Sequence, residues 1–132
     1  MKTTWQNYVV ASEWVGEKSS VWGKGDDSSR HHVVTITNMD TDESIEFDYW
    51  TSIAHPEFED ERELLEAVSC FFGDAEWGQL NFYEYCREQG FDIPDGIRKS
   101  WKGCRKANRK VEKFFGESEW HNLVDKLNEE LY

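Results

Sequence analysis

The sequence predicts an α+β fold, in which a three-stranded antiparallel β-meander is followed by three to four helices packed on one face of the sheet. Apolar residues alternate with polar ones up to about residue 55 and recur at helical spacing afterwards, so the strands come first. A length of 132 residues fits a single domain, with the β-meander over about 1–55 and the helical part over about 56–132. Aromatic residues make up 15% of the chain, which is enough to build a core although 32% of the residues are charged.

Three segments have the composition of β-strands. Residues 5–15 are rich in Trp, Tyr and Val, and residues 31–38 are rich in Val, Ile and Thr. Between them, residues 16–30 contain Gly, Asp and Ser at a density typical of a loop. In residues 43–52, Ile, Phe and Tyr alternate with Glu, Asp and Trp, so one face of this strand is buried and the other is solvated. The turn-forming residues 38–42 join the last two strands in a tight hairpin.

Two helices follow the predicted strands. The first covers about residues 60–72, has an acidic start that suits a helix N-terminus, and is ended by Gly73. Asn81 is the expected N-cap of a shorter helix, which ends at Gly90.

The longest predicted helix runs from Asp95 to Phe115, and a last helix begins near Ser118, its expected N-cap. Both carry apolar residues at helical spacing, which predicts one buried stripe on each. The expected core residues of these helices are Ile97, Trp101, Cys104, Val111 and Phe115, followed by Trp120, Leu123, Val124, Leu127 and Leu131.

Charge is distributed very unevenly along the chain. The net charge is −12, which disfavours general contact with DNA, RNA or anionic membranes. Between Asp95 and Lys113, however, eight basic and two acidic residues give a local net charge of +6, so the remainder has a net charge of −18. The predicted helix therefore carries a basic outer face on an otherwise acidic chain.

Three interpretations of this asymmetry stay open. In the first, the acidic surface binds a basic partner by mimicking nucleic acid, through Asp40, Asp42, Glu46, Glu57, Glu59, Asp60 and Glu63, with Glu43, Asp48, Glu61 and Glu66 beside them. In the second, the basic face holds phosphates through Arg98, Lys102, Arg105, Lys106, Arg109 and Lys113. The expected burial of Trp101 argues against the second, because it leaves no exposed aromatic ring on which bases stack. In the third, the charges form solvated faces that pair with one another.

No arrangement of residues points to catalysis, to a metal or to a cofactor. His31 and His32 are neighbours in a strand, so their rings point to opposite faces and cannot bind one ion together, although either one, with His55 and an acidic partner, remains an alternative. Residues 23–29 resemble a phosphate loop only superficially, because they lack its spacing and contain two aspartates. The chain is therefore predicted not to be an enzyme and to need no cofactor.

The three cysteines and the hydropathy predict a cytoplasmic protein. Cys70, Cys86 and Cys104 are odd in number, form no CxxC motif and lie at apolar helix positions, so we expect buried free thiols in a reducing compartment. Neither a membrane-spanning segment nor a signal-peptide core is recognisable.

Four features follow one another between residues 43 and 132. They are an aromatic strand over 47–52 followed by His55, an acidic helix with Cys70, the run from Asn81 to Asp92, and the basic helix up to Gly116. In these features, and over roughly residues 43–132, the chain resembles a group of short, mostly uncharacterised proteins encoded in bacteriophages and prophages. The chain departs from the group at residues 52–55, where the group usually shows a Ser-Gly or Gly-His pair.

This resemblance implies a small early phage protein, and such proteins often inhibit host defence systems. We therefore expect a non-enzymatic inhibitor that binds a host nucleic-acid-processing or defence protein, such as a CRISPR–Cas or restriction component. Trp50 or Trp22 is the expected aromatic anchor of the interface. The alternative is an accessory protein that binds nucleic acid or a nucleoprotein complex through the basic helix over 97–113. Tight binding to duplex DNA alone is not expected.

Overall fold

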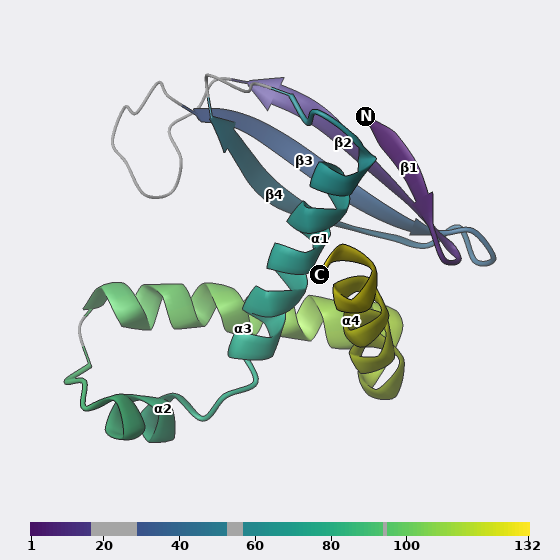
Figure 1. Cartoon of the computed structure of the whole chain (residues 1–132). Helices are drawn as coiled ribbons and strands as arrows, with labels where there is room; N and C mark the ends of the chain where they lie inside the picture. Colours follow the sequence, from purple (N-terminus) through teal and green to yellow (C-terminus); the bar gives the residue numbers. More distant parts are fainter. Residues whose placement is uncertain (17–28, 53–56, 94) are drawn as a thin grey trace. The chain divides into compact units, whose positions relative to one another are not determined.

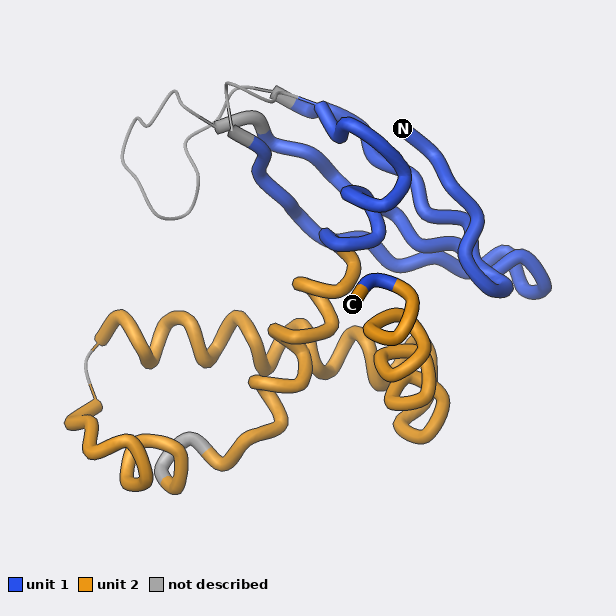
Figure 2. Tube along the Cα trace, viewed as in Figure 1, with its two compact units in different colours: residues 1–67, 131 blue, residues 68–130, 132 orange. Residues whose placement is uncertain are grey.

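The computed structural model describes residues 1–16, 29–52, 57–93 and 95–132. These residues form two compact units, shown in blue and orange in Figure 2. Unit 1 comprises Met1–Ala67 with Leu131, and unit 2 comprises Val68–Glu130 with Tyr132. The predicted single domain, with its helices on one face of the sheet, stays a prediction.

Unit 1 contains a four-stranded antiparallel sheet whose strands lie in chain order (Figure 1). They are β1 (Lys2–Trp5), β2 (Tyr8–Gly16), β3 (Ser29–Asn38) and β4 (Ser44–Ser52). The α+β class and the antiparallel meander are confirmed, but the predicted number of three strands is wrong. The segment predicted as one strand folds back on itself at residues 6 and 7.

The additional strand depends on a two-residue turn. Trp5 pairs directly with Tyr8, so only Gln6 and Asn7 connect β1 to β2. Gln6 adopts a φ of 53°, a conformation that usually favours Gly, Asn or Asp. Since neither Gly nor Pro marks this turn in the sequence, the composition of residues 5–15 predicts an uninterrupted strand.

One face of the sheet carries the core of unit 1. Val10 lies opposite Ile36, and Val34 lies opposite Phe47, and all four side chains are buried. Phe58 packs on the same face, with ring centroids 5.2 Å from His32 and 5.7 Å from Tyr49. The predicted alternation along β4 is confirmed, because Glu46 and Asp48 on its other face are exposed.

Four helices follow the sheet: α1 (Glu61–Trp77), α2 (Phe82–Gln89), α3 (Asp95–Phe115) and α4 (Glu117–Leu131). The division between the two units falls within α1, after Ala67. Helix α1 continues through Gly73 for another turn, so its predicted end is wrong. Ala75 beyond this glycine is fully buried, and its packing outweighs the helix cost of about 1 kcal/mol for one glycine.

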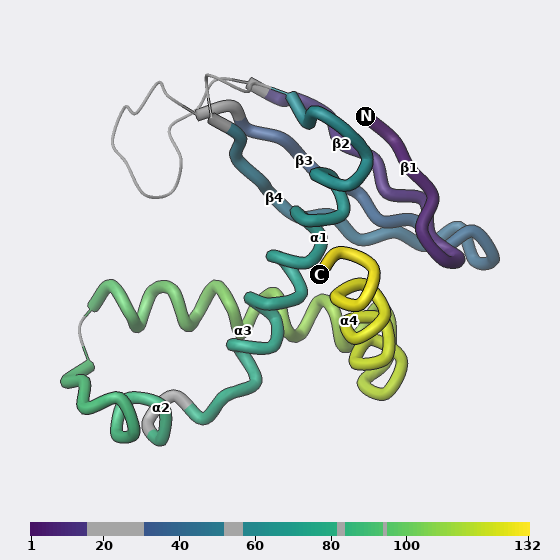
Figure 3. Tube along the Cα trace, in the orientation of Figure 1, coloured from purple at the N-terminus to yellow at the C-terminus, as the bar shows by residue number. Residues whose placement is uncertain are grey.

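The core of unit 2 is built around Phe72 of α1. Its ring centroid lies 5.6 Å from that of Phe115 and 6.3 Å from that of Trp120. The predicted inner stripe of α4 is confirmed, since all five of its residues are buried. The chain turns between α3 and α4 (Figure 3). Gly116 at this turn has a φ of 84°, and no side chain caps α4, so the predicted Ser118 cap is wrong.

The predicted stripe of α3 is buried only toward its C-terminal end. Val111 and Phe115 are buried, whereas Trp101 and Cys104 are half-buried, so the prediction that both lie in the core is wrong. The expectation of three buried thiols is also wrong, because Cys86 is buried while Cys70 is exposed. All three thiols are free, as expected.

Candidate functional site

The seven predicted acidic residues fall in three places of unit 1. Asp40 and Asp42 lie in the turn between β3 and β4, and Glu46 lies on the outer face of the sheet, opposite the core face. The other four lie just before α1 or in its first turn: Glu57, Glu59, Asp60 and Glu63. Six of the seven side chains are exposed and Glu63 is half-buried.

The β3–β4 turn holds its carboxylates at the tip of a well-bonded hairpin. The side-chain oxygen of Asn38 accepts hydrogen bonds from the backbone N–H of Asp40 at 2.9 Å and of Thr41 at 3.3 Å. The Asn7 amide donates to the Asp40 carboxylate at 2.7 Å, which ties this turn to the one between β1 and β2. Asp42 adopts a φ of 60°, so a larger side chain there is strained.

Asp60 and Glu63 have a structural role at the start of α1. The Asp60 carboxylate accepts a hydrogen bond from the backbone N–H of Glu63 at 2.9 Å, as an N-cap does. The Glu63 carboxylate accepts one from the backbone N–H of Glu59 at 2.6 Å, which closes a variant of the capping box. Of the four acidic side chains in this segment, two therefore accept backbone hydrogen bonds, and the one accepted by Asp60 comes from a helix N–H group.

The outer face of the sheet combines acidic and aromatic side chains. The His31 ring stacks on Trp50, with ring centroids 4.8 Å apart and an interplanar angle of 12°. The Nε2 atom of the same histidine lies 2.7 Å from the Asp48 carboxylate. Register places Glu13 in the same row as Asp48, with Val33 between them. Trp50 and several carboxylates thus share one face.

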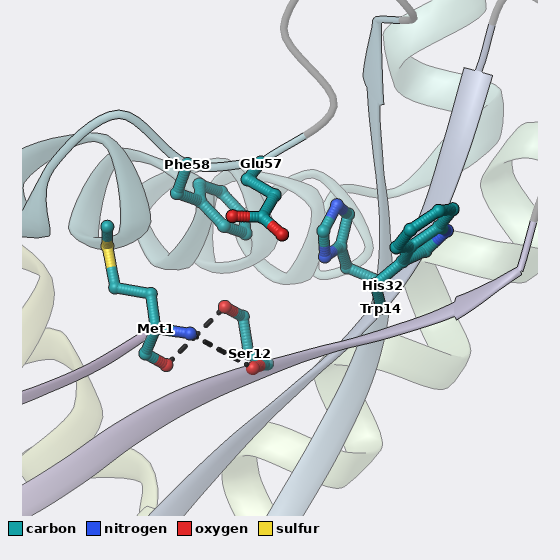
Figure 4. Close-up of a pocket in the computed structure, with 6 residues that line it drawn as sticks. All are labelled: Met1, Ser12, Trp14, His32, Glu57 and Phe58. Carbon is teal, nitrogen blue, oxygen red and sulfur yellow. Dashed lines mark hydrogen bonds between the residues drawn. The ribbon is translucent and has the colours of Figure 1, made fainter.

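A hollow of about 250 Å³ lies over the core face of the same sheet (Figure 4). Trp14, His32, Glu57 and Phe58 line it together with Met1 and Ser12. His32 is buried and its Nε2 atom lies 3.2 Å from the Thr51 hydroxyl. The two histidines thus occupy opposite faces of the sheet, as predicted.

The basic face of α3 is fully presented to solvent. All six residues predicted for it are exposed: Arg98, Lys102, Arg105, Lys106, Arg109 and Lys113. The guanidinium carbon of Arg105 lies 4.6 Å from the ring centroid of Trp101, in a cation–π contact. Trp101 therefore belongs partly to this face, which removes the argument that the basic helix has no accessible aromatic ring.

A second hollow, of about 360 Å³, lies beside the basic face within unit 2. Arg105 and Arg109 line it from α3, Glu117 from α4, and Gly78 and Gln79 from the segment after α1. Glu112 also lines it and accepts a hydrogen bond from the Gln79 amide at 3.2 Å. Asn108 forms part of the same wall and is buried.

Close backbone packing shapes this second hollow. A Cβ atom on Gly78 would overlap the carbonyl group of Cys104 in α3 and lie 2.8 Å from the backbone nitrogen of Arg105. Only glycine allows the segment after α1 to approach α3 this closely.

The electrostatics around Cys104 oppose thiolate formation. Burial and, to a smaller extent, the negative charge of Asp74 together raise the pKa of this thiol to about 11. Burial also raises the pKa of the Asp74 carboxyl. Because nucleophilic cysteines need a lowered pKa, the Cys104 thiol is unsuited to that role.

Two features are absent from the described part of the chain. Residues 1–16, 29–52, 57–93 and 95–132 contain no group of three or more His, Cys, Asp or Glu side chains placed to hold a metal ion. None of the described helices is long and apolar enough to span a membrane. The residues Trp22, His55 and the loop over 23–28 lie outside the described residues.

In comparisons with known proteins, no family model, no curated protein and no solved structure matches this chain.

Sequence reasoning missed the residues that form the hollow in unit 2. Gly78, Gln79 and Asn108 belong to no motif, and only the chain path brings them beside Arg105 and Arg109. A glycine directly after a helix usually serves only to end that helix, so the sequence does not indicate that Gly78 packs against α3.

Proposed function

We propose that this chain is a non-enzymatic inhibitor of the phage type, which binds a host nucleic-acid-processing or defence protein in the host cytoplasm. CRISPR–Cas and restriction components are the leading candidates, on the resemblance described above. In this proposal the carboxylates of unit 1 take the place of nucleic-acid phosphates on a basic surface of the partner.

The observation that carries the proposal is the division of charge between the two units. Residues 1–67 contain fifteen acidic and five basic residues, a net charge of −10, whereas residues 68–132 have a net charge of only −2. Exposed carboxylates at the β3–β4 turn, on the outer sheet face and before α1 contribute to this charge. Such a surface accelerates association with a basic partner and discriminates against acidic ones.

Aromatic side chains supply the second ingredient of an interface. Trp14 is 48% exposed, and Trp50 lies stacked on His31 beside Asp48. Trp residues that are desolvated at the centre of an interface commonly dominate its binding energy, while the surrounding charges steer the encounter.

A second candidate function uses unit 2. An accessory protein that binds nucleic acid or a nucleoprotein complex through residues 97–113 is favoured by the contact between Arg105 and Trp101, because a stacked Arg–Trp pair is a platform for bases.

A pull-down from host lysate at low and moderate salt tests the inhibitor role. We expect a small number of basic or nucleic-acid-binding proteins to be retained at low salt and to be weakened at moderate salt. If no host protein is retained at either salt concentration, the inhibitor role is wrong.

A further inference from the structure

The hollow in unit 2 has the chemistry of a ligand site that the inhibitor role does not use, and a ligand bound there deepens the second candidate function, on which this inference rests. Arg105 and Arg109 lie one helical turn apart on α3 and both line the hollow. Neither guanidinium forms an ion pair with any residue of the part of the chain that the structure describes. Arg105 is held over the Trp101 ring, so the edge of its planar fork is free to donate hydrogen bonds.

The same hollow presents acceptors as well as donors. Glu117 lines it from the first turn of α4, and the Glu112 carboxylate, held by Gln79, lines it from α3. Two carboxylates in the lining of one hollow repel a lone phosphate or sulfate, so a simple oxyanion site does not fit. The lining instead suits a group whose edge carries both hydrogen-bond donors and acceptors.

A nucleobase has such an edge, and its size suits the hollow. Unpaired bases expose both donors and acceptors, which arginine and carboxylate side chains recognise. The volume of about 360 Å³ lies at the lower end of the range for small-ligand sites, about 300–1,000 Å³. One base therefore fits, whereas a duplex does not, because its base edges are paired and lie within the grooves.

The basic face continues from the hollow as a track for phosphates. Arg98, Lys102, Arg105 and Arg109 recur at spacings of four, three and four residues, so they form one stripe along α3, and all four are exposed. We propose that the hollow binds one unpaired base of a single-stranded RNA or DNA, and that this stripe contacts the phosphates of the same strand. This site lies in unit 2 and is independent of the acidic surface of unit 1.

Binding of fluorescently labelled single-stranded RNA and DNA ten-mers of mixed sequence, measured by anisotropy, tests the proposal. The variant Arg105→Ala/Arg109→Ala is compared with Lys99→Ala/Lys110→Ala, which removes the same charge from the same helix but leaves the hollow intact. We expect the arginine pair to weaken binding by about tenfold or more and the lysine pair by about threefold or less. Equal losses, or no binding of either strand by the unmodified protein, would overturn the proposal. The stronger of the RNA and DNA signals identifies the natural strand.

Two further measurements separate base recognition from charge alone. Glu117→Gln removes a negative charge, so pure electrostatics predicts tighter binding, whereas loss of a base contact predicts weaker binding. An abasic strand keeps every phosphate, and we expect it to bind the unmodified protein several-fold more weakly than the intact strand. Tighter binding of Glu117→Gln together with equal binding of the abasic strand would refute a base site. Far-ultraviolet circular dichroism checks that each variant keeps its helices.

Discussion

At Gly78, the backbone after α1 touches the backbone of α3, and a hydrogen atom is the only side chain that fits. We predict that Gly78→Ala lowers the free energy of unfolding by about 1–3 kcal/mol, because the added methyl group forces the two segments apart. Gly73→Ala is the matched control. Its methyl group meets no atom within 4 Å, and it should raise the helix stability by about 0.5–1 kcal/mol. Urea unfolding measures both, and changes of the same sign would contradict the packing described.

Asp74 and Cys104 form an electrostatic pair that can be tested by titration. Asp74→Asn removes the negative charge and should lower the pKa of the Cys104 thiol from about 11, but not to its ordinary value, because burial is the larger cause. The pH dependence of alkylation in a Cys70→Ser background measures this pKa without the exposed thiol. An unchanged profile would show that Asp74 does not act on Cys104.

The same substitution carries a signed prediction for stability. The pKa of Asp74 is raised in the folded chain, so the folded state binds more protons than the unfolded state between the two pKa values. The ionised carboxylate therefore destabilises the fold at neutral pH, and this effect disappears as the pH falls below the unfolded pKa. Asp74→Asn should melt at a slightly higher temperature than the unmodified protein at pH 7 and at the same temperature near pH 3.

At the scale of elements, α1 depends on its N-terminal cap. Asp60→Ala removes the side-chain acceptor for the Glu63 N–H and should cost about 1 kcal/mol in the free energy of unfolding. Glu61→Ala, at an exposed neighbouring position without a capping bond, should cost less than half as much. Chemical denaturation measures the free energy of unfolding of both variants. Equal losses would mean that Asp60 stabilises the helix only through its charge and not through its capping hydrogen bond.

Elements with a strong periodic pattern were predictable from the sequence. The alternation along β4 and the inner stripe of α4 follow directly from their apolar spacing, and both are confirmed. The turn at Gln6 and the continuation of α1 through Gly73 were not predictable, because both depend on pairing and packing that override local preference. The half-burial of Trp101 likewise arises because other elements bury α3 mainly toward its C-terminal end. The spacing of apolar residues along one helix does not predict which part of that helix is covered.

The candidate site was predictable in composition but not in roles. The exposure of the acidic residues follows from their charge, and the structure agrees with it for six of the seven. Sequence spacing did not separate Asp60 and Glu63, which cap α1, from Glu57, which makes no capping bond. A variant that replaces all of these residues therefore cannot separate the loss of a binding contact from the destabilisation of α1.

At the scale of the whole molecule, the net charge of −12 governs non-specific contacts. We predict no mobility shift of random duplex DNA at sub-micromolar protein. The acidic residues repel the duplex, and the basic residues of α3 are too few to offset this by neutralising phosphates and releasing the counterions of the DNA. A salt-sensitive shift would show that the basic face dominates. Reversal of Arg105, Lys106 and Arg109 to Glu should then abolish it.

The central claim, that unit 1 binds a basic partner through its carboxylates, is tested most directly by matched charge reversal. The variant Glu43→Lys/Glu57→Lys/Glu61→Lys alters exposed residues of unit 1 and spares the cap, and Glu76→Lys/Glu88→Lys/Glu129→Lys makes the same change in unit 2. The measurement is the Kd of each variant for the partner retained from host lysate, at low salt. We predict that the unit 1 variant binds at least about tenfold more weakly than the unmodified protein, while the unit 2 variant changes by less than about threefold. Full retention of affinity by the unit 1 variant, or equal losses in both, would contradict the claim.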